Sequence, residues 1–299
     1  MSFPSTSHTS TPATQVMGIL NVTDDSFSDG GRYVAVDSAL AQARQMLAEG
    51  ADIIDVGGES TRPGATRVDP QQEASRIRPV IEQLSANNTV TSIDTMRAST
   101  AAVAVEAGVH YLNDVSGGLA DPDMLTVAAQ SGLPIILMHW KADTFESAAG
   151  YEQHGDIVAH VREFLLRRVD AAVAAGVAPE KVIVDPGIGF AKSPQDNWRL
   201  LQATGQLASE FADQSLRMLI GASRKRFLTA LRPAADGAPG DPSSADDATA
   251  AVSAIAAIQG AWAVRVHAVA PSRAAVDVAY AVATGSGPDV PEDWRARRG

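Results

Sequence analysis

The chain contains no cysteine and is short of basic residues. Without cysteine, the protein has no disulfides, thiolate metal sites or thiol nucleophiles. It has 24 Lys and Arg residues and 35 Asp and Glu residues, which gives a net charge of −11. Surfaces that bind nucleic acids or anionic membranes need a basic footprint, so we expect neither partner. A cytoplasmic enzyme that acts on small molecules fits this composition.

The sequence also lacks a convincing membrane span. Residues 248–264 carry no charge, but polar residues and a glycine interrupt the stretch. It is also at the lower limit of length for crossing a bilayer. An Ala-rich helix followed by a buried strand is the better interpretation.

The two ends of the chain differ from its middle. Residues 1–14 are rich in Ser, Thr and Pro and lack the basic start and apolar core of a secretory signal. They predict a disordered N-terminal tail, and residues 286–299 predict a polar C-terminal tail. Between them, residues 15–285 are expected to form one domain.

Short β-like runs recur along the chain, each followed by a helical pattern. The expected strands are residues 15–21, 51–57, 89–95, 110–116, 134–140, 181–187, 217–223 and 261–267. The expected helices lie near 37–49, 70–86, 97–107, 121–131, 154–175, 194–203, 245–259 and 271–283. Helix-start signals are Asp37, Asp69, Asp121 and Ser193, and helix-stop signals are Gly50, Gly108, Gly132 and Gly176.

This alternation predicts an α/β protein with a single (β/α)₈ TIM barrel. The alternative is a doubly wound open sheet, which usually has fewer strand–helix units. No Gly-x-Gly-x-x-Gly motif follows the first strand to support it.

Polar side chains stand at the carboxyl ends of most expected strands. They are Asn21, Asp94, Asn113, His139, Asp185, Ser223 and His267. In a barrel these ends share one face, and that face holds the active site. The residues therefore predict a polar pocket at the barrel mouth.

Two long loops follow the first two expected strands. NVTDDSFSDGG (21–31) and GGESTRPGATR (57–67) combine glycines with hydroxyl groups, and the second carries Arg62 and Arg67. Loops of this kind can close over a ligand and exclude water. Ordinary surface loops are the alternative interpretation of each.

A basic segment, GASRKRF (221–227), stands out in an acidic protein. It places Ser223, Arg224, Lys225 and Arg226 at the end of the seventh strand, where barrels commonly bind phosphate. Arg265 and His267 on the eighth strand alternate with Val266, so they should share a face. Together with Arg62, these residues could hold a dianionic leaving group.

Acidic and amide groups are expected deeper in the pocket. Asp185 could accept two parallel hydrogen bonds from an amino group beside a ring N–H. Asp94 could stabilise positive charge that develops on a substrate, and Asn113 lies near both. Helix capping is the alternative role for the two carboxylates.

A metal site of the zinc type is not indicated, because the six histidines show no i, i+4 pair. Mg²⁺ held by one protein oxygen and by substrate phosphates is the better expectation. Asn21 could supply that oxygen.

Eight ordered motifs resemble those of the dihydropteroate synthases, the sulfonamide-inhibited folate-pathway family, and most closely its actinobacterial members. They are MGILNVTDDSFSDGG, DIIDVGGESTRPGA, SIDTMR, NDVSGG, ILMHW, VIVDPGIGFAK, IGASRKRFL and RVH. The resemblance covers roughly residues 15–285. It implies a homodimeric transferase that joins 4-aminobenzoate to 6-hydroxymethyl-7,8-dihydropterin pyrophosphate with the help of Mg²⁺.

The resemblance also assigns roles to single residues. Asp94, Asn113, Asp185 and Lys225 would surround the pterin. Arg62, Arg265 and His267 would hold pyrophosphate, with Mg²⁺ reaching Asn21. Thr61, Pro63, Phe190 and Ser223 would line the 4-aminobenzoate site. Phe27 and Asp29 would close over it.

One departure leaves a second interpretation open. The family's RVHDV reads RVHAV here, so Ala268 replaces Asp. The alternative is a poorly active or non-catalytic paralog that binds pterin or a protein partner. A corrinoid-dependent methyltransferase of the same superfamily should lack the SRK and RVH motifs that this chain contains.

Overall fold

The computed structural model describes residues 14–22, 32–59, 68–140, 155–233, 237 and 240–289. Residues 1–13 and 290–299, which make up most of the two expected tails, lie outside this range. So do most of the first long loop and residues 60–67 of the second.

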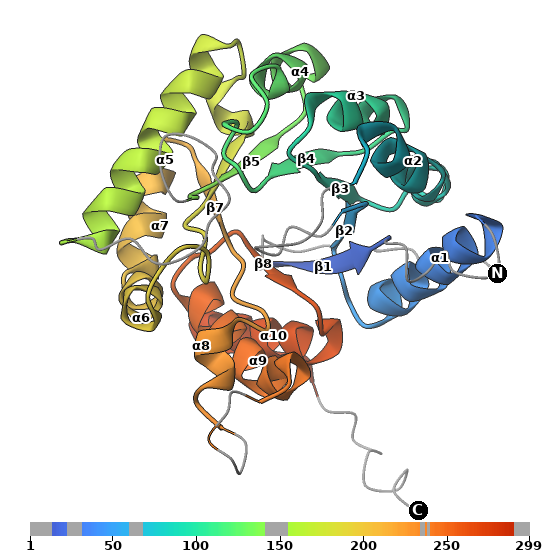
Figure 1. Ribbon diagram of the computed structural model, residues 1–299. Helices are drawn as coiled ribbons and strands as arrows, with labels where there is room; N and C mark the ends of the chain where they lie inside the picture. The colour runs from blue at the N-terminus through green and yellow to red at the C-terminus, as the bar shows by residue number, and fades with distance from the viewer. Residues whose placement is uncertain are drawn as a thin grey trace, which may run out of the picture.

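Eight parallel strands form a closed barrel in chain order, with helices around it (Figure 1). The strands are β1 (Gln15–Asn21), β2 (Ile53–Gly57), β3 (Thr91–Asp94), β4 (Tyr111–Asp114), β5 (Ile135–Met138), β6 (Val182–Asp185), β7 (Arg217–Ile220) and β8 (Ala263–Val266). Closure comes from β8 pairing with β1, where Gln15 lies opposite Ala263. The (β/α)₈ prediction is therefore confirmed.

The helices follow the strands along the chain. They are α1 (Arg32–Ala48), α2 (Pro70–Ala86), α3 (Ala98–Glu106), α4 (Met124–Ser131), α5 (Ile157–Ala174), α6 (Pro194–Gln202), α7 (Thr204–Ala212), α8 (Arg226–Thr229), α9 (Asp246–Ile258) and α10 (Val269–Thr284), with short 3₁₀ turns η2 (Pro179–Lys181) and η3 (Pro242–Ala245). Among the described residues, no helix combines the length and apolarity needed to cross a bilayer.

The helix-start signals are half right. Asp69 accepts hydrogen bonds from the first turn of α2, and Ser193 does the same for α6. Asp37 is wrong because α1 already begins at Arg32. Asp121 is not the N-cap, because α4 begins at Met124, but its Oδ1 accepts the Asp123 backbone N–H at 3.0 Å in the turn before the helix, and its Oδ2 accepts the Ala98 backbone N–H at 2.8 Å.

The predicted helix-stop glycines are confirmed. Gly50, Gly108, Gly132 and Gly176 all have positive φ angles, a backbone conformation that glycine adopts at little cost. The helix α7 was not expected: the sequence predicted one helix over 194–203 and no further element before the strand at 217, whereas α7 begins one residue after the end of α6, beyond Ala203.

An apolar cluster fills the inside of the barrel. It consists of Met17, Ile53, Ile136, Ile183, Leu219 and Ala263, all fully buried. Side chains alternate between the two faces of a strand, so their sequence neighbours point outward into a second, larger core beneath the helices. The barrel is therefore closed below its mouth, and polar chemistry is confined to the ends of the strands.

The helix α10 begins without a capping side chain. Ala268 occupies its N-cap with an extended backbone and makes no side-chain hydrogen bond there. Strand alternation also predicts that position 268 faces away from Arg265 and His267, toward the helices, and this placement at the start of α10 agrees with it.

We expect Ala268→Asp to raise the free energy of unfolding by about 1 kcal/mol, because a carboxylate at an N-cap accepts hydrogen bonds from free backbone N–H groups. Urea denaturation would measure the change. Ala175→Asp is the matched control, since Ala175 is the C-cap of α5, where a carboxylate meets the negative end of the helix. An equal gain at both positions would refute the capping explanation.

Candidate functional site

The barrel mouth carries a layer of charged groups directly above the apolar interior. Asp55, Asp185 and Arg265 each lie two residues after a member of the interior cluster on the same strand. Because side chains alternate along a strand, all three point into the barrel. This layer forms the floor of the candidate site.

Arg265 is held between two carboxylates. Its Nε donates to Asp55 Oδ2 at 2.6 Å, and its Nη2 donates to Asp94 Oδ2 at 2.7 Å. Asn113 Nδ2 donates to the same Asp55 oxygen at 3.2 Å. Three strand-end residues named from the sequence thus meet here, and Asp55 joins them.

The charges at this floor are costly to bury. Burial raises the pKa of Asp94, while the Arg265 guanidinium opposes the rise. Burial also disfavours the charge on Arg265, but Asp55 and Asp94 hold its pKa above the ordinary value. Asp55 Oδ1 and Asp94 Oδ1 have no hydrogen-bond partner among the described residues. Each of these two buried oxygens therefore keeps an unused acceptor position.

Asp185 supplies the second acidic position of the floor. Its Oδ1 accepts a hydrogen bond from the backbone N–H of Gly187 at 2.7 Å. Burial raises its pKa to about 6, against the lowering effects of that hydrogen bond and of Lys192, Lys225 and Arg265. Gly221 makes room beside it, since a Cβ there would lie 3.4 Å from Asp185 Oδ2. The capping alternative fails for Asp185, because its bond closes a loop rather than a helix end.

The rim of the site brings together the residues that follow β7 and β8. Ser223 Oγ lies 3.0 Å from His267 Nδ1 and accepts the His267 backbone N–H at 3.1 Å. Lys225 Nζ lies 3.7 Å from the centre of the Phe190 ring. Asn21, at the end of β1, is exposed on the same rim.

Two residues of the basic segment after β7 have different roles. Lys225 faces Phe190 in the site, but Arg224 turns away from it. Arg224 has a left-handed backbone (φ 58°) and a bidentate ion pair with Asp246, with both N–O distances 2.8 Å. Arg224 therefore ties the segment to the first residue of α9 and is not available to an anion at the mouth.

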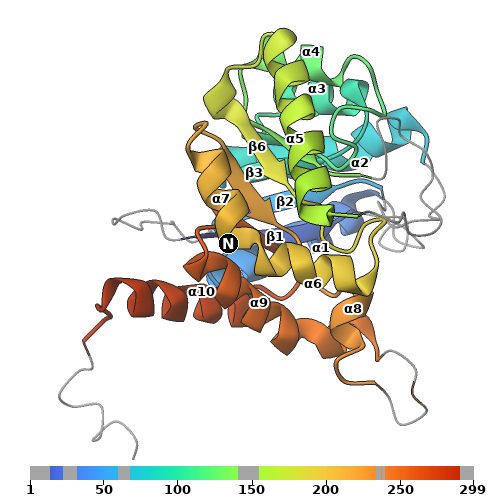
Figure 2. The same cartoon turned by 90° about the vertical axis from the view of Figure 1, so that its left-hand side faces the viewer.

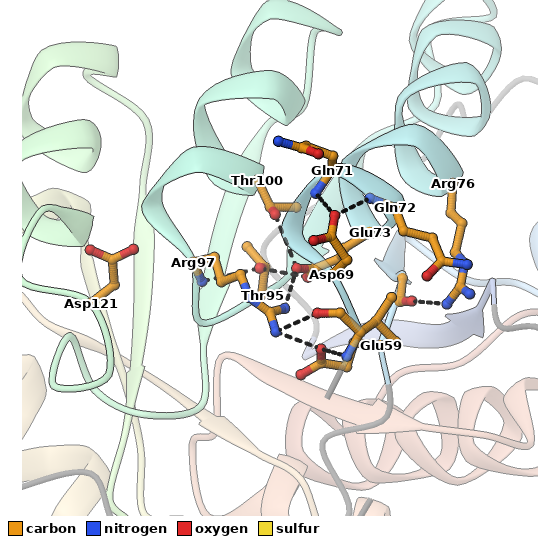
Figure 3. Close-up of polar contacts among 12 residues, drawn as sticks. Glu59, Asp69, Gln71, Gln72, Glu73, Arg76, Thr95, Arg97, Thr100 and Asp121 are labelled. Carbon is orange, nitrogen blue, oxygen red and sulfur yellow. Dashed lines mark hydrogen bonds and ion pairs between the residues drawn. The ribbon is translucent and has the colours of Figure 1, made fainter. Parts of the chain in front are cut away.

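Both ends of the second long loop are anchored by one buried network (Figure 3). Arg97 Nη2 pairs with Glu59 Oε2 at 2.8 Å and donates to the Val68 carbonyl at 2.9 Å. Glu59 Oε2 also accepts the Val68 backbone N–H at 2.8 Å. Arg97 Nη1 bonds to the buried Glu73, which also accepts the Thr95 hydroxyl at 2.7 Å. The residues on either side of segment 60–67 are thereby held together.

Several residues named from the sequence lie outside the described part of the chain. They are Phe27, Asp29, Thr61, Arg62, Pro63 and Arg67. Their roles remain those that the family resemblance implies.

Two buried charged residues of the site were missed by sequence reasoning. Asp55 lies inside the expected second strand, two residues after Ile53, and strand alternation alone could have placed it in the barrel. Lys192 is 2% exposed, and the only sequence signal for it was its place at the end of the motif VIVDPGIGFAK.

We expect Arg265→Met to lower the free energy of unfolding by about 3–5 kcal/mol, because it leaves two buried carboxylates without their cation. Loss of the cation also raises the native pKa of Asp94 further above its unfolded value. The native state then binds more protons than the unfolded state, so stability falls as pH rises through that interval.

The deficit relative to wild type should therefore be larger near pH 8 than near pH 6, as measured by urea denaturation. Arg217→Met is the control, because Arg217 packs on the Trp262 ring and begins β7, away from the carboxyl ends of the strands. A deficit that is equal at both pH values would contradict the assigned role of Asp94.

Comparisons with known proteins agree with this geometry. Residues 17–267 match the family model described as pterin binding enzyme. A dihydropteroate synthase of Mycobacterium leprae is 50% identical over 263 residues, which are 88% of this chain and 90% of the relative.

Solved structures show the same fold. A Xanthomonas albilineans dihydropteroate synthase with 4-aminobenzoic acid superposes with a TM-score of 0.80 at 38% identity, covering 92% of this chain and 94% of that one. A structure of the enzyme from the same organism in complex with 7,8-dihydropteroate gives 0.77 at 36% identity, covering 92% and 95%. With its closed barrel and charged mouth, the chain belongs to the pterin-binding enzyme family.

Proposed function

We propose that this protein condenses 6-hydroxymethyl-7,8-dihydropterin pyrophosphate with 4-aminobenzoate, giving 7,8-dihydropteroate and pyrophosphate in folate biosynthesis. This is the reaction of a dihydropteroate synthase, the name carried by relatives of nearly the same length. The observation that carries the proposal is the acidic floor of Asp55, Asp94 and Asp185 around Arg265. It offers carboxylate oxygens to a ring that is rich in N–H donors.

Asp185 and Asn113 would hold the pterin. An ionised Asp185 can accept two parallel hydrogen bonds from the amino group and the adjacent ring N–H. Asn113 lies on β4, next to β3 and Asp94, and its amide can both donate and accept. Lys225 stands over the Phe190 ring and would close one side of the pocket.

The chemistry proposed for the site begins with loss of pyrophosphate. The bond between the pterin methylene carbon and the pyrophosphate oxygen breaks, and the electron pair leaves with pyrophosphate. The cation left on the pterin is stabilised by the carboxylate of Asp94, which is already in place before charge develops. The nitrogen of 4-aminobenzoate then bonds to the methylene carbon and loses a proton.

The leaving group needs positive charge at the mouth. Arg62, His267 and Arg265 would bind pyrophosphate, and Ser223 would line the 4-aminobenzoate site beside Thr61, Pro63 and Phe190. Phe27 and Asp29 would complete the site from the first loop.

Asn21 would hold Mg²⁺ together with pyrophosphate oxygens. Its side chain is exposed at the rim, and no group of three His, Asp or Glu residues gathers within the described ranges. One protein oxygen plus substrate phosphates is the coordination that Mg²⁺ commonly adopts. When bound, the ion would neutralise charge on the leaving group.

The paralog alternative rests on Ala268 alone. That residue occupies the N-cap of α10, whereas the His267 imidazole faces Ser223. An Asp at 268 would serve the helix rather than the imidazole, so its absence does not argue against catalysis.

The proposal is tested with purified protein, Mg²⁺, the pterin pyrophosphate and labelled 4-aminobenzoate. Labelled dihydropteroate should form together with one pyrophosphate per product. Binding of the pterin without any product, under conditions where a known dihydropteroate synthase turns over, would favour the non-catalytic paralog.

We expect Asp185→Asn to weaken binding of the pterin about 100-fold near pH 7.5, because hydrogen bonds to a charged group contribute about 1.5–3 kcal/mol. Wild-type affinity should fall as pH drops below about 6, where the carboxyl takes up a proton. The variant should lose this pH dependence. Calorimetric titration would measure both, with the exposed Asp213→Asn as the control.

Two neighbouring helices carry an exposed apolar surface that fits a homodimer interface. Ile255 and Ile258 on α9 are 52% and 58% exposed, and Val278 and Val282 on α10 are 61% and 69% exposed. The two helices lie side by side (Figure 2), and Ser253 on α9 contacts Ser272 on α10. Exposed aliphatic residues gathered on one side of a protein mark an interaction surface.

In light scattering at micromolar concentration, the wild type should have about twice the mass of the chain. The double variant Ile255→Glu with Ile258→Glu should have the mass of a monomer, because buried unpaired charge opposes association. Val173→Glu on α5 is the control, since Val173 is also exposed but lies on another helix. A monomeric wild type would disprove the assignment.

A further inference from the structure

One buried lysine of the barrel mouth has no role in the proposed reaction. Lys192 lies between β6 and α6 and is only 2% exposed. An ammonium ion is rarely buried to this degree unless its three N–H donors are satisfied. Its partners therefore indicate what the residue is for.

Lys192 Nζ has three partners within hydrogen-bond distance, and two of them are carbonyl oxygens that accept from it. The three partners are His139 Nδ1 at 2.9 Å, the Gly187 carbonyl at 2.9 Å and the Phe190 carbonyl at 3.1 Å. An ammonium has three donors, which equals the number of these contacts. One partner lies just after β5, and the other two lie in the loop after β6.

That loop approaches the end of β5 very closely. Gly187 has a φ of +67°, and a Cβ on it would lie 2.1 Å from the His139 carbonyl oxygen. Ala191, the neighbour of Lys192, also has a positive φ of 47°, a backbone conformation that is unfavourable for a residue with a side chain. Such a backbone persists only where its surroundings hold it, and Lys192 donates two hydrogen bonds to carbonyls of this loop, those of Gly187 and Phe190.

The same loop carries Phe190 and follows Asp185. The Phe190 ring packs against Trp140, with ring centres 5.3 Å apart, and Lys225 Nζ lies 3.7 Å from its centre. The Phe190 carbonyl accepts a hydrogen bond from Lys192 on the buried side of the loop. The backbone that carries this ring is therefore held from the interior of the protein.

We propose that Lys192 is a positioning residue of the substrate site: it joins His139 to the loop after β6 and so holds the Phe190 ring in place beside Lys225. That this ring meets a substrate rests on the proposed function. The hydrogen bonds themselves do not depend on it.

Lys192 also acts on Asp185 through its charge. Burial lowers the pKa of Lys192 to about 7, and the Asp185 carboxylate opposes that shift. In the other direction, Lys192 lowers the pKa of Asp185, as do the Gly187 N–H, Lys225 and Arg265. Removing Lys192 should therefore raise the pKa of Asp185, and pterin affinity should begin to fall at a higher pH than in the wild type.

The test replaces Lys192 by Met, which keeps the length and apolar volume but removes all three donors. Lys181→Met is the matched control, because Lys181 lies at the opposite end of β6 and is half-buried. At about pH 6.5, Lys192→Met should raise the KM for 4-aminobenzoate about tenfold and leave kcat within about threefold, since its effect is on binding geometry. Lys181→Met should change neither constant.

A second readout needs no turnover. With 4-fluorophenylalanine incorporated, the ¹⁹F resonance of Phe190, assigned through Phe190→Leu, should shift and broaden in Lys192→Met but not in Lys181→Met. If Lys192→Met does not fold, Lys192→Gln keeps two donors and should give a smaller change of the same kind.

The two proposals fail in different ways. A wild type that forms no dihydropteroate would reject the function, while the ¹⁹F spectrum still tests Lys192. An unchanged Phe190 resonance in the folded Met or Gln variant would overturn the positioning role. In an active enzyme, an unchanged KM would overturn it as well.

Discussion

The site depends on burying three acidic side chains inside a barrel whose interior is otherwise apolar. Arg265 makes this possible for two of them, because it bonds to Asp55 and Asp94 from a neighbouring part of the closed sheet. A buried carboxylate that loses its paired cation strongly destabilises the fold. The strand order of the barrel brings β8 beside β1 and near β2 and β3, so the fold itself supplies the cation that the acids require.

Much of this arrangement could be predicted from single residues. The alternation of Arg265, Val266 and His267 correctly placed Val266 in the outer core and Arg265 toward the mouth. The strand-end positions of Asp94, Asn113 and Asp185 correctly predicted a shared polar face. Such predictions hold because the parallel strands of a barrel share one geometry. The position of a residue in its strand then determines whether its side chain points into the barrel or toward the helices.

Features that depend on partners far along the chain could not be predicted in this way. The sequence shows Arg224 within a basic segment, but its bidentate bond to Asp246 follows from a local left-handed backbone. The expected anion group therefore lost one member. Lys192 likewise has an ordinary place in a loop, and its burial follows from the approach of Gly187 to His139. Tertiary contacts determine where such a side chain lies in the folded protein, and the sequence pattern and spacing do not reveal those contacts.

The network of Glu59, Glu73 and Arg97 has a consequence for how this protein can vary. It fastens the chain at Glu59 and Val68 through groups that lie outside segment 60–67. Once two ends are fixed, the free energy of closing the chain between them changes only slowly with its length. The length and composition of segment 60–67 can therefore vary with little effect on the stability of the barrel.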